Sequence, residues 1–229
     1  MTVDDVVKLL DAATRLLGVL LWPLLVTVVM FRFGPSFKLF FEQLGEFSLK
    51  GAGFEASAKR RQAEAAAALG AATASRPEQD STPEAQALEA RTAAEIVSEV
   101  TPRMIRRAER ATVLWVDDRP ENNVYERRSL EALGVTFALA KSTDEALQMV
   151  ARQKFDVIIS DMGRPPDAQA GYTLLDKLRQ GGNTTPYIIY AGSRDPHHRV
   201  EARRHGALDC TNRPDELFEY VLFALGRSA

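Results

Sequence analysis

The sequence contains few of the residues that form covalent cross-links or bind soft metals. Among 229 residues there are one cysteine, Cys210, and three histidines. A single thiol cannot form an intramolecular disulfide, and it suits a reducing compartment. The histidines, His197, His198 and His205, lack the companion ligands of a zinc site, so we expect them to be ordinary surface or packing residues.

Neither sign of charge is in excess, because 29 lysine and arginine residues stand against 31 aspartate and glutamate residues. The formal net charge of −2 gives no bulk attraction to nucleic acid, and we expect no nucleic-acid partner. The sequence also lacks a phosphate-binding glycine loop, a catalytic triad and a group of histidines that could supply a catalytic base. These absences argue against an enzyme that acts on a small molecule, and we expect that the protein is not an enzyme.

Long apolar runs are scarce as well, and one stands out at residues 16–31, sixteen positions without a charge. As a helix it covers about 24 Å, which is short of the ~30 Å hydrocarbon core of a bilayer. Arg15 and Arg32 extend the span because their long side chains can reach the interface. We favour a single transmembrane helix over about residues 12–33. A cleaved signal peptide and a buried or interfacial helix stay open as alternatives.

The stretches around this run complete the N-terminal half. Residues 1–46 form the predicted membrane anchor, which ends in an amphipathic helix with an apolar face at Phe37, Phe40, Phe41 and Leu44. Residues 47–58 alternate polar and apolar side chains around two glycines, which predicts a short β-hairpin. An isolated hairpin is only marginally stable, so we expect it to pair with another copy of the chain or to pack on the membrane. Residues 59–110 should form alanine-rich helices, with a flexible polar linker at residues 76–86 and a fresh helix start at Thr101-Pro102.

Residues 111–229 show regular alternation of strand-like and helix-like patterns, which is typical of a parallel α/β sheet. The predicted strands are residues 113–116, 135–140, 155–160, 187–191 and 207–211. Ser142 and Glu145 have the spacing of a capping box, which starts a helix. We predict a five-stranded, flavodoxin-like parallel sheet of order 2-1-3-4-5 with helices on both faces.

Carboxylates follow two of these strands directly. Asp161 ends the apolar run at 155–160, and Asp117 and Asp118 follow the run at 113–116. In open α/β sheets the working site lies beyond the carboxyl ends of the strands, so neighbouring strands would bring the three carboxylates together. Their mutual repulsion requires a cation or a shared proton, and oxygen ligands favour Mg²⁺.

These residues resemble the receiver domain of bacterial response regulators over about residues 112–226. The resemblance rests on the order and spacing of Val116-Asp117-Asp118, Asp161, Gly206-Ala207 and Arg213-Pro214. It implies that Asp161 accepts a phosphoryl group and that Asp117 and Asp118 hold Mg²⁺ with it. It further implies that the backbone carbonyl of Gly163 is a metal ligand, and that Arg213 replaces the usual lysine as charge partner of the phosphoryl group.

The sequence departs from the family pattern where receivers report phosphorylation. Ala191 stands in place of the switch hydroxyl, and the nearest substitute, Ser193, lies two residues further on. Cys210 occupies the position of the switch aromatic, and the loop at residues 163–171 is about two residues longer than usual. The acidic residues are therefore retained, whereas the residues that transmit their state are altered.

Two functions stay open on this basis. The first is a membrane-anchored signalling protein, single-pass in the bacterial inner membrane, whose cytoplasmic domain accepts a phosphoryl group from a histidine kinase or responds to another protein partner. Its orientation follows from the basic residues, which are more numerous after the apolar run than before it. The alternative is a pseudo-receiver that recognises a partner without phosphorylation and controls a membrane-acting, oligomeric effector, for example in bacterial defence. For either function we expect the protein to form a homo-oligomer.

Overall fold

The computed structural model describes residues 55–75, 82–191 and 196–227. The chain divides into two units, Met1–Phe54 and Glu55–Ala229, and every described residue belongs to the second. The predicted membrane helix at residues 12–33 and its amphipathic continuation lie outside the described residues and stay predictions. Across the ranges that are described, no helix is both long and apolar enough to cross a bilayer.

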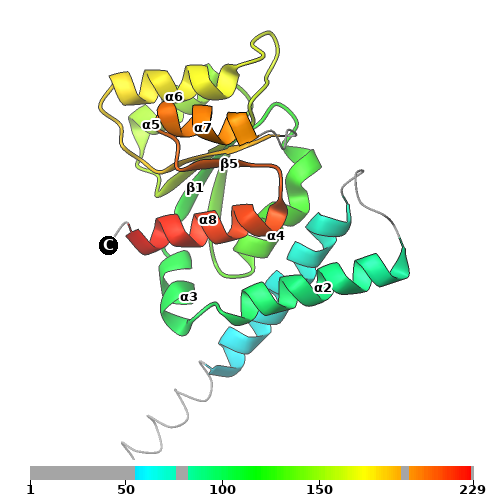
Figure 1. Ribbon diagram of the computed structural model, residues 1–229. Helices are drawn as coiled ribbons and strands as arrows, with labels where there is room; N and C mark the ends of the chain where they lie inside the picture. The colour runs from blue at the N-terminus through cyan, green and yellow to red at the C-terminus, as the bar shows by residue number, and fades with distance from the viewer. Residues whose placement is uncertain (1–54, 76–81, 192–195, 228–229) are drawn as a thin grey trace, which may run out of the picture. The chain divides into compact units, whose positions relative to one another are not determined.

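A five-stranded parallel sheet forms the centre of the second unit (Figure 1). Its strands are β1 (Thr112–Val116), β2 (Thr136–Ala140), β3 (Val157–Ser160), β4 (Tyr187–Tyr190) and β5 (Asp209–Thr211). They lie in the order β2-β1-β3-β4-β5, and all neighbours are parallel. The predicted sheet and its strand order are confirmed.

The central strands are buried on both faces, which explains their unbroken apolar runs. Successive side chains of a strand point to opposite faces. In β1, accordingly, Val113 and Trp115 belong to one hydrophobic core while Leu114 and Val116 belong to the other. The aromatic ring of Trp115 packs edge-on against Phe137 and Tyr190, so Trp115 is a packing residue of the sheet.

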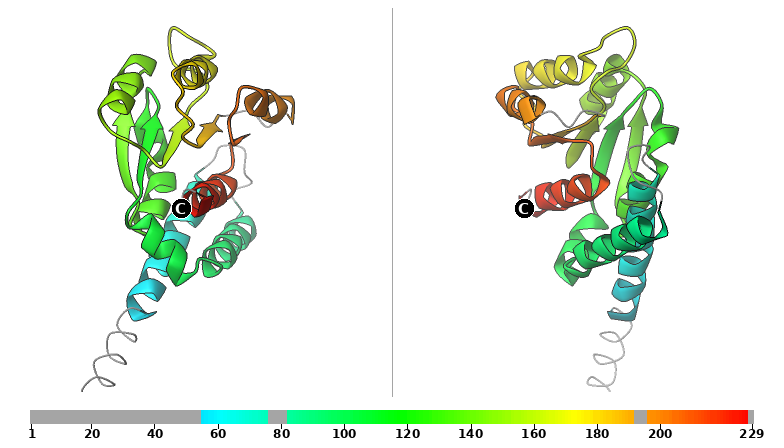
Figure 2. Two further views of the ribbon diagram at one scale, coloured as in Figure 1. Left: turned by 90° about the vertical axis from the view of Figure 1, so that its left-hand side faces the viewer. Right: turned by 45° about the vertical axis from the view of Figure 1, so that its right-hand side comes forward.

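Helices cover both faces of the sheet (Figure 2). One core takes side chains of α4 (Val124–Glu131) and α8 (Pro214–Arg227), and the other takes those of α5 (Thr143–Arg152), α6 (Ala170–Gln180) and α7 (Pro196–Arg204). A short 3₁₀ helix, η1 (Pro120–Asn123), leads into α4. The Ser142 hydroxyl accepts a hydrogen bond from the Glu145 N–H at 3.2 Å, so the predicted cap of α5 is confirmed.

The helices that precede the sheet pack onto it. Residues 55–74 are helical and are followed by α2 (Pro83–Ser98) and α3 (Pro102–Ala108). Their apolar side chains share one core with α8, and α2 and α3 lie against α8 (Figure 1). The Thr101 hydroxyl accepts from the Met104 N–H at 3.3 Å, which confirms the predicted helix start. The α/β domain is therefore continuous with its N-terminal helices.

Two predictions about this N-terminal region are wrong in their described part. Residues 55–58, predicted as part of the second hairpin strand, are helical. The reason is that Ala58, Ala65, Leu69 and Ala72 recur at helical spacing and are buried, which outweighs a four-residue alternation. The polar linker is also shorter than predicted, because α2 already begins at Pro83, a residue favoured at the first position of a helix. The rest of the hairpin and residues 76–81 lie outside the described ranges.

Candidate functional site

The three predicted carboxylates lie together at the carboxyl edge of the sheet. Val116 of β1 pairs with Ser160 of β3, so the next residues, Asp117 and Asp161, leave neighbouring strands side by side. Asp117, Asp118 and Asp161 each offer a carboxylate oxygen within 4.8 Å of the others. The strand register thus brings together three residues that lie up to forty-four positions apart in the sequence.

Asp117 is the most buried of the three, with an exposed fraction of 6%. Its Oδ1 accepts the Arg119 N–H at 2.8 Å and its Oδ2 accepts the Asn123 amide at 2.7 Å. Asp118 is partly exposed, and its carboxylate lies 3.8 Å from the Arg119 guanidinium. These contacts fix the orientation of Asp117 and leave each carboxylate free lone pairs for a further ligand.

Burial raises the pKa of Asp161 above its usual range, and the neighbouring charge of Asp117 raises it further. The Met162 N–H, which donates to Asp161 Oδ1 at 2.8 Å, and the positive charge of Arg164 act in the opposite direction. The net effect is a pKa of Asp161 above its usual range. A bound cation would relieve this repulsion.

The donor set of the cluster fits Mg²⁺. All three side chains offer oxygen, which hard divalent cations prefer, and their ionised forms supply the charge that draws such a cation. Asp117, Asp118 and Asp161 would hold the ion. Gly163 lies in the loop directly after β3 and lines the cavity beside Asp161, so its predicted role as a carbonyl ligand stays a prediction.

A cavity of about 700 Å³ opens beside Asp161. Both altered switch positions, Ala191 after β4 and Cys210 in β5, line it, together with Tyr172 and His205, whose rings stack. Burial raises the pKa of the Cys210 thiol to about 11, so this thiol stays protonated at neutral pH. Small side chains at the switch positions thus border an open volume next to the predicted acceptor. Ser193 lies outside the described residues.

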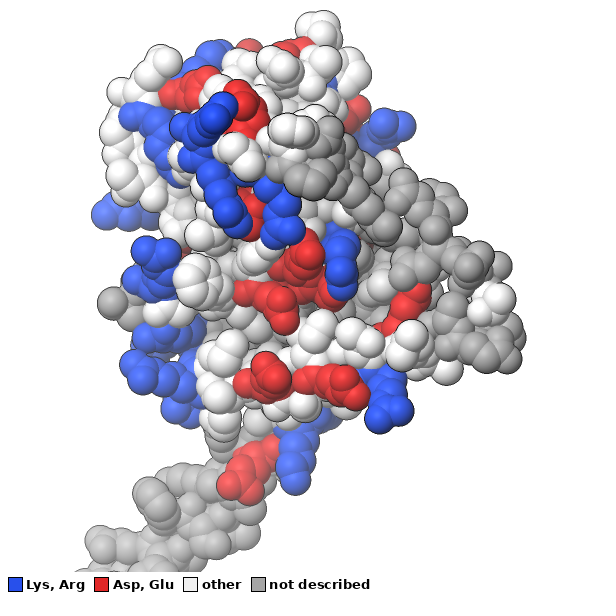
Figure 3. Space-filling model, in the orientation of Figure 1, with Lys and Arg blue, Asp and Glu red and all other residues white. Residues whose placement is uncertain are grey.

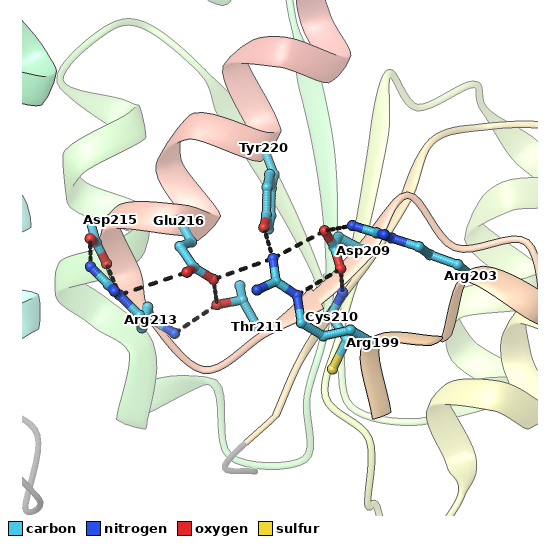
Figure 4. Close-up of polar contacts among 9 residues, drawn as sticks. All are labelled: Arg199, Arg203, Asp209, Cys210, Thr211, Arg213, Asp215, Glu216 and Tyr220. Atoms are coloured by element: carbon cyan, nitrogen blue, oxygen red, sulfur yellow. Dashed lines mark hydrogen bonds and ion pairs between the residues drawn. The ribbon is translucent and has the colours of Figure 1, made fainter. Parts of the chain in front are cut away.

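Arg213 points toward a different group of side chains (Figure 4). Its guanidinium donates to both carboxylate oxygens of Asp215, from Nε at 3.0 Å and from Nη2, and it lies 3.9 Å from Glu216. Among the described residues, none of its hydrogen bonds or ion pairs reaches Asp161. Arg213, the predicted charge partner of the phosphoryl group, is therefore paired with carboxylates in the first turn of α8.

Arg213 belongs to a network that joins α7, β5 and α8. Asp209, 4% exposed, accepts from Arg199 at 3.2 Å and from Arg203 at 2.8 Å. Burial alone would raise the pKa of Asp209, yet the hydrogen bonds from the two arginines hold it below its usual range. Thr211 donates to Glu216 at 2.6 Å. Figure 3 shows basic side chains over α7 facing acidic side chains over α8.

Sequence analysis missed one charged residue at the site, Arg164. Its guanidinium is buried in the loop after β3 and donates to the Asp161 backbone carbonyl at 2.6 Å. The only sequence signal was its place three residues after Asp161 in a lengthened loop. An arginine in a polar loop is more often solvated, so its burial could not be expected.

Comparisons with known proteins agree with this geometry. The family model of the response regulator receiver domain matches residues 113–221. The sensor histidine kinase RcsC of Escherichia coli (strain K12) is 28% identical over 102 residues, which cover 44% of this chain and 10% of the kinase. The DNA-binding transcriptional regulator NtrC of the same strain is 29% identical over 110 residues, or 48% of this chain and 23% of that protein.

Among solved structures, the receiver domain of the Francisella response regulator 1452 matches with a TM-score of 0.48 and 27% identity, covering 52% of this chain and 99% of that one. The chain spans well under two thirds of the length of both curated relatives. In sequence match and strand order, residues 113–221 are similar to the response regulator receiver domains of two-component signalling.

Proposed function

We propose that Asp161 accepts a phosphoryl group from a phosphohistidine of a partner kinase, with Mg²⁺ held by Asp117, Asp118 and Asp161 and by the Gly163 carbonyl. The observation that carries this proposal is the convergence of the three carboxylates within 4.8 Å. Receiver domains typically bind Mg²⁺ at such an acidic site, and one of the curated relatives named above is a sensor histidine kinase.

In the proposed transfer, an Asp161 carboxylate oxygen attacks phosphorus in line with the leaving imidazole nitrogen. The P–N bond breaks as the O–P bond forms, and the imidazole takes up a proton from solvent. Bound Mg²⁺ would neutralise charge on the phosphoryl oxygens. The chain's own contribution is placement: the Met162 N–H orients Asp161, and Asn123 and the Arg119 N–H orient Asp117. The chain is a phosphoryl acceptor in this scheme and not an enzyme.

We also propose that the domain works on the cytoplasmic face of the bacterial inner membrane, anchored by a single span at about residues 12–33, and that copies of the chain associate. The apolar run and the basic residues that follow it support the anchor. Flotation of the purified chain with liposomes should be lost when residues 1–54 are removed. Equal flotation without those residues would refute the anchor.

A second candidate function is partner recognition without phosphorylation, with output through a membrane-acting oligomer. Two observations favour it: Ala191 has no hydroxyl to bond a phosphoryl group, and Arg213 is engaged by Asp215. In this alternative the acidic edge binds Mg²⁺ or a basic group of the partner, and no covalent step follows.

Beryllofluoride, a mimic of the acyl phosphate, separates the two candidates. We would titrate it by calorimetry into the full chain in detergent at saturating Mg²⁺, with Asp161→Asn as the matched control. Saturable binding that Asp161→Asn abolishes is the expected result. Absence of binding by a folded wild-type chain would reject phosphorylation and leave the recognition module. Without Mg²⁺, Asp161→Asn should also melt slightly higher than wild type, because it removes one of the repelling charges.

A further inference from the structure

Arg164 lies in the loop that joins β3 to α6, and it is held there by its backbone. Its N–H donates to the Asp167 carbonyl at 3.0 Å, and its own carbonyl accepts from the Asp167 N–H at 2.8 Å. The side chain turns inward and is 3% exposed. A long charged side chain in a surface loop is rarely buried to this extent unless it has partners.

The guanidinium contacts four separate elements around the acceptor. Nη1 donates to the Ser160 hydroxyl at 2.6 Å, to the Asp161 carbonyl at 2.6 Å and to the Val116 carbonyl at 3.4 Å. Nη2 donates to the Ala170 carbonyl at 3.0 Å and to the Thr143 hydroxyl at 3.2 Å. One side chain thus ties the ends of β1 and β3 to the first turns of α5 and α6.

None of these five acceptors carries a charge, so the guanidinium brings its full positive charge into the site. Its Nε is buried without a hydrogen-bond partner. Burial lowers the pKa of Arg164, while nearby Tyr187 and the carboxylates of Asp161, Asp117 and Asp118 raise it. Arg164 therefore acts by charge on the acidic cluster and by contact on the backbone of Asp161.

Arg213 differs from Arg164 in both respects. Its side chain is 53% exposed, and its charge is matched by Asp215 at short range. Moving it toward Asp161 would require breaking that pair, whereas Arg164 is already in place. The two arginines also differ in constraint, because Arg164 is enclosed by several elements and Arg213 has a carboxylate partner on one helix turn.

We propose that Arg164 is the positioning cation of the phospho-acceptor and takes the place that the family pattern assigns to residue 213. It fixes the Asp161 backbone between β1 and β3, and its charge favours an anionic phosphoryl group on Asp161. This inference rests on the proposed phosphorylation and names a residue that serves it.

The competing explanation is that Arg164 only holds the backbone of the loop and the strands together. The two explanations predict opposite changes in Mg²⁺ affinity when Arg164 is replaced. Loss of a structural tie would disorder the edge and weaken every ligand. Loss of a nearby positive charge would strengthen binding of Mg²⁺ and weaken binding of an anion. The ratio of the Mg²⁺ affinity to the beryllofluoride affinity therefore distinguishes the two explanations.

The test compares Arg164→Met with Arg213→Met, the same substitution at the two arginines, in the full chain in detergent. Calorimetry gives the Mg²⁺ affinity, and then the beryllofluoride affinity at saturating Mg²⁺. For Arg164→Met we expect Mg²⁺ binding to tighten by about threefold and beryllofluoride binding to weaken by at least about tenfold. For Arg213→Met we expect both affinities to stay within about twofold of wild type.

Two milder variants cover the case in which Arg164→Met does not fold. Arg164→Lys keeps the charge but offers a single ammonium, so Mg²⁺ affinity should be unchanged while beryllofluoride affinity falls by about threefold. Ser160→Ala removes one acceptor of Nη1 and should act in the same way. Circular dichroism melts identify any variant that fails to fold.

Parallel loss of both affinities in Arg164→Met, or an equal effect of Arg213→Met, overturns the assignment of Arg164. A beryllofluoride affinity of Arg164→Met that stays at the wild-type value overturns it as well. If wild type itself binds no beryllofluoride, the proposed phosphorylation fails. The Mg²⁺ affinity of Arg164→Met then still shows whether the Arg164 charge acts on the acidic cluster.

Discussion

Charged side chains gather at the carboxyl end of β3 and along the segment from β5 to the first turn of α8, but the balance of charge differs between the two clusters. At the end of β3, three carboxylates lie within 4.8 Å of one another, and the described cationic groups in contact with these residues are the buried Arg164 and the exposed Arg119. In the second cluster, Asp209 at the start of β5 and Asp215 in the first turn of α8 each have an arginine at hydrogen-bond distance (Figure 4). One cluster is short of positive charge, and the other is matched.

This difference separates a site from a structural element. A matched cluster lowers the pKa of its carboxyl, as for Asp209, and its ionisation then stabilises the fold. At the first cluster, burial and then the neighbouring charge of Asp117 raise the pKa of Asp161, so its ionisation costs stability. A cation bound by the three carboxylates would offset this cost.

Breaking the matched cluster should have the larger effect on stability. Asp209→Asn leaves Arg199 and Arg203 without their shared carboxylate and should lower the free energy of unfolding by about 1–2 kcal/mol, a value reduced because both arginines are partly exposed. Urea unfolding at pH 7 measures it. Asp144→Asn, at an exposed aspartate of α5, is the matched control and should change stability by less than about 0.5 kcal/mol.

The same variant has a pH signature. The pKa of Asp209 in the folded protein lies below its unfolded value of 3.8, so its contribution to stability is fully present above that value. The contribution is lost as the pH falls through the folded pKa. Wild type should therefore lose stability on acidification more steeply than Asp209→Asn. Parallel pH profiles would show that Asp209 is not a stabilising ion pair.

Sequence patterns predicted most of the sheet and the acidic edge because both depend on local rules. Unbroken apolar runs mark buried parallel strands, and the carboxyl-end rule then places Asp117 and Asp161 together once β1 and β3 are neighbours. Strand ends were less certain: the run predicted at residues 155–160 pairs regularly only at Val157–Ser160. The predicted start of β3 was wrong by two residues, because the sequence next to a strand indicates only weakly where its hydrogen bonds to the neighbouring strand begin.

The positions of the arginines could not be predicted, because they depend on competition between partners. Arg213 has Asp215 two residues away, and this local pairing outweighs a longer reach to Asp161. Arg164 finds its acceptors on four elements, and two of these acceptors, Val116 and Thr143, lie 48 and 21 residues away in the sequence. No periodic pattern encodes such contacts, whereas the folded arrangement of β1, β3, α5 and α6 brings them together.

The smallest expected effect concerns the cluster around Asp161. It tests whether a hydroxyl at residue 191 is all that the site lacks for bonding a phosphoryl group. Ala191→Thr places a hydroxyl on the wall of the cavity beside Asp161, where it can donate to a bound phosphoryl mimic. One added hydrogen bond is worth about 1 kcal/mol, so beryllofluoride affinity should rise by about fivefold in calorimetry. Ala191→Val, which has the same shape without the hydroxyl, is the matched control and should not bind more tightly. If Ala191→Thr and Ala191→Val bind beryllofluoride equally, the added hydroxyl makes no hydrogen bond to the ligand. The cavity beside residue 191 would then not hold a phosphoryl oxygen.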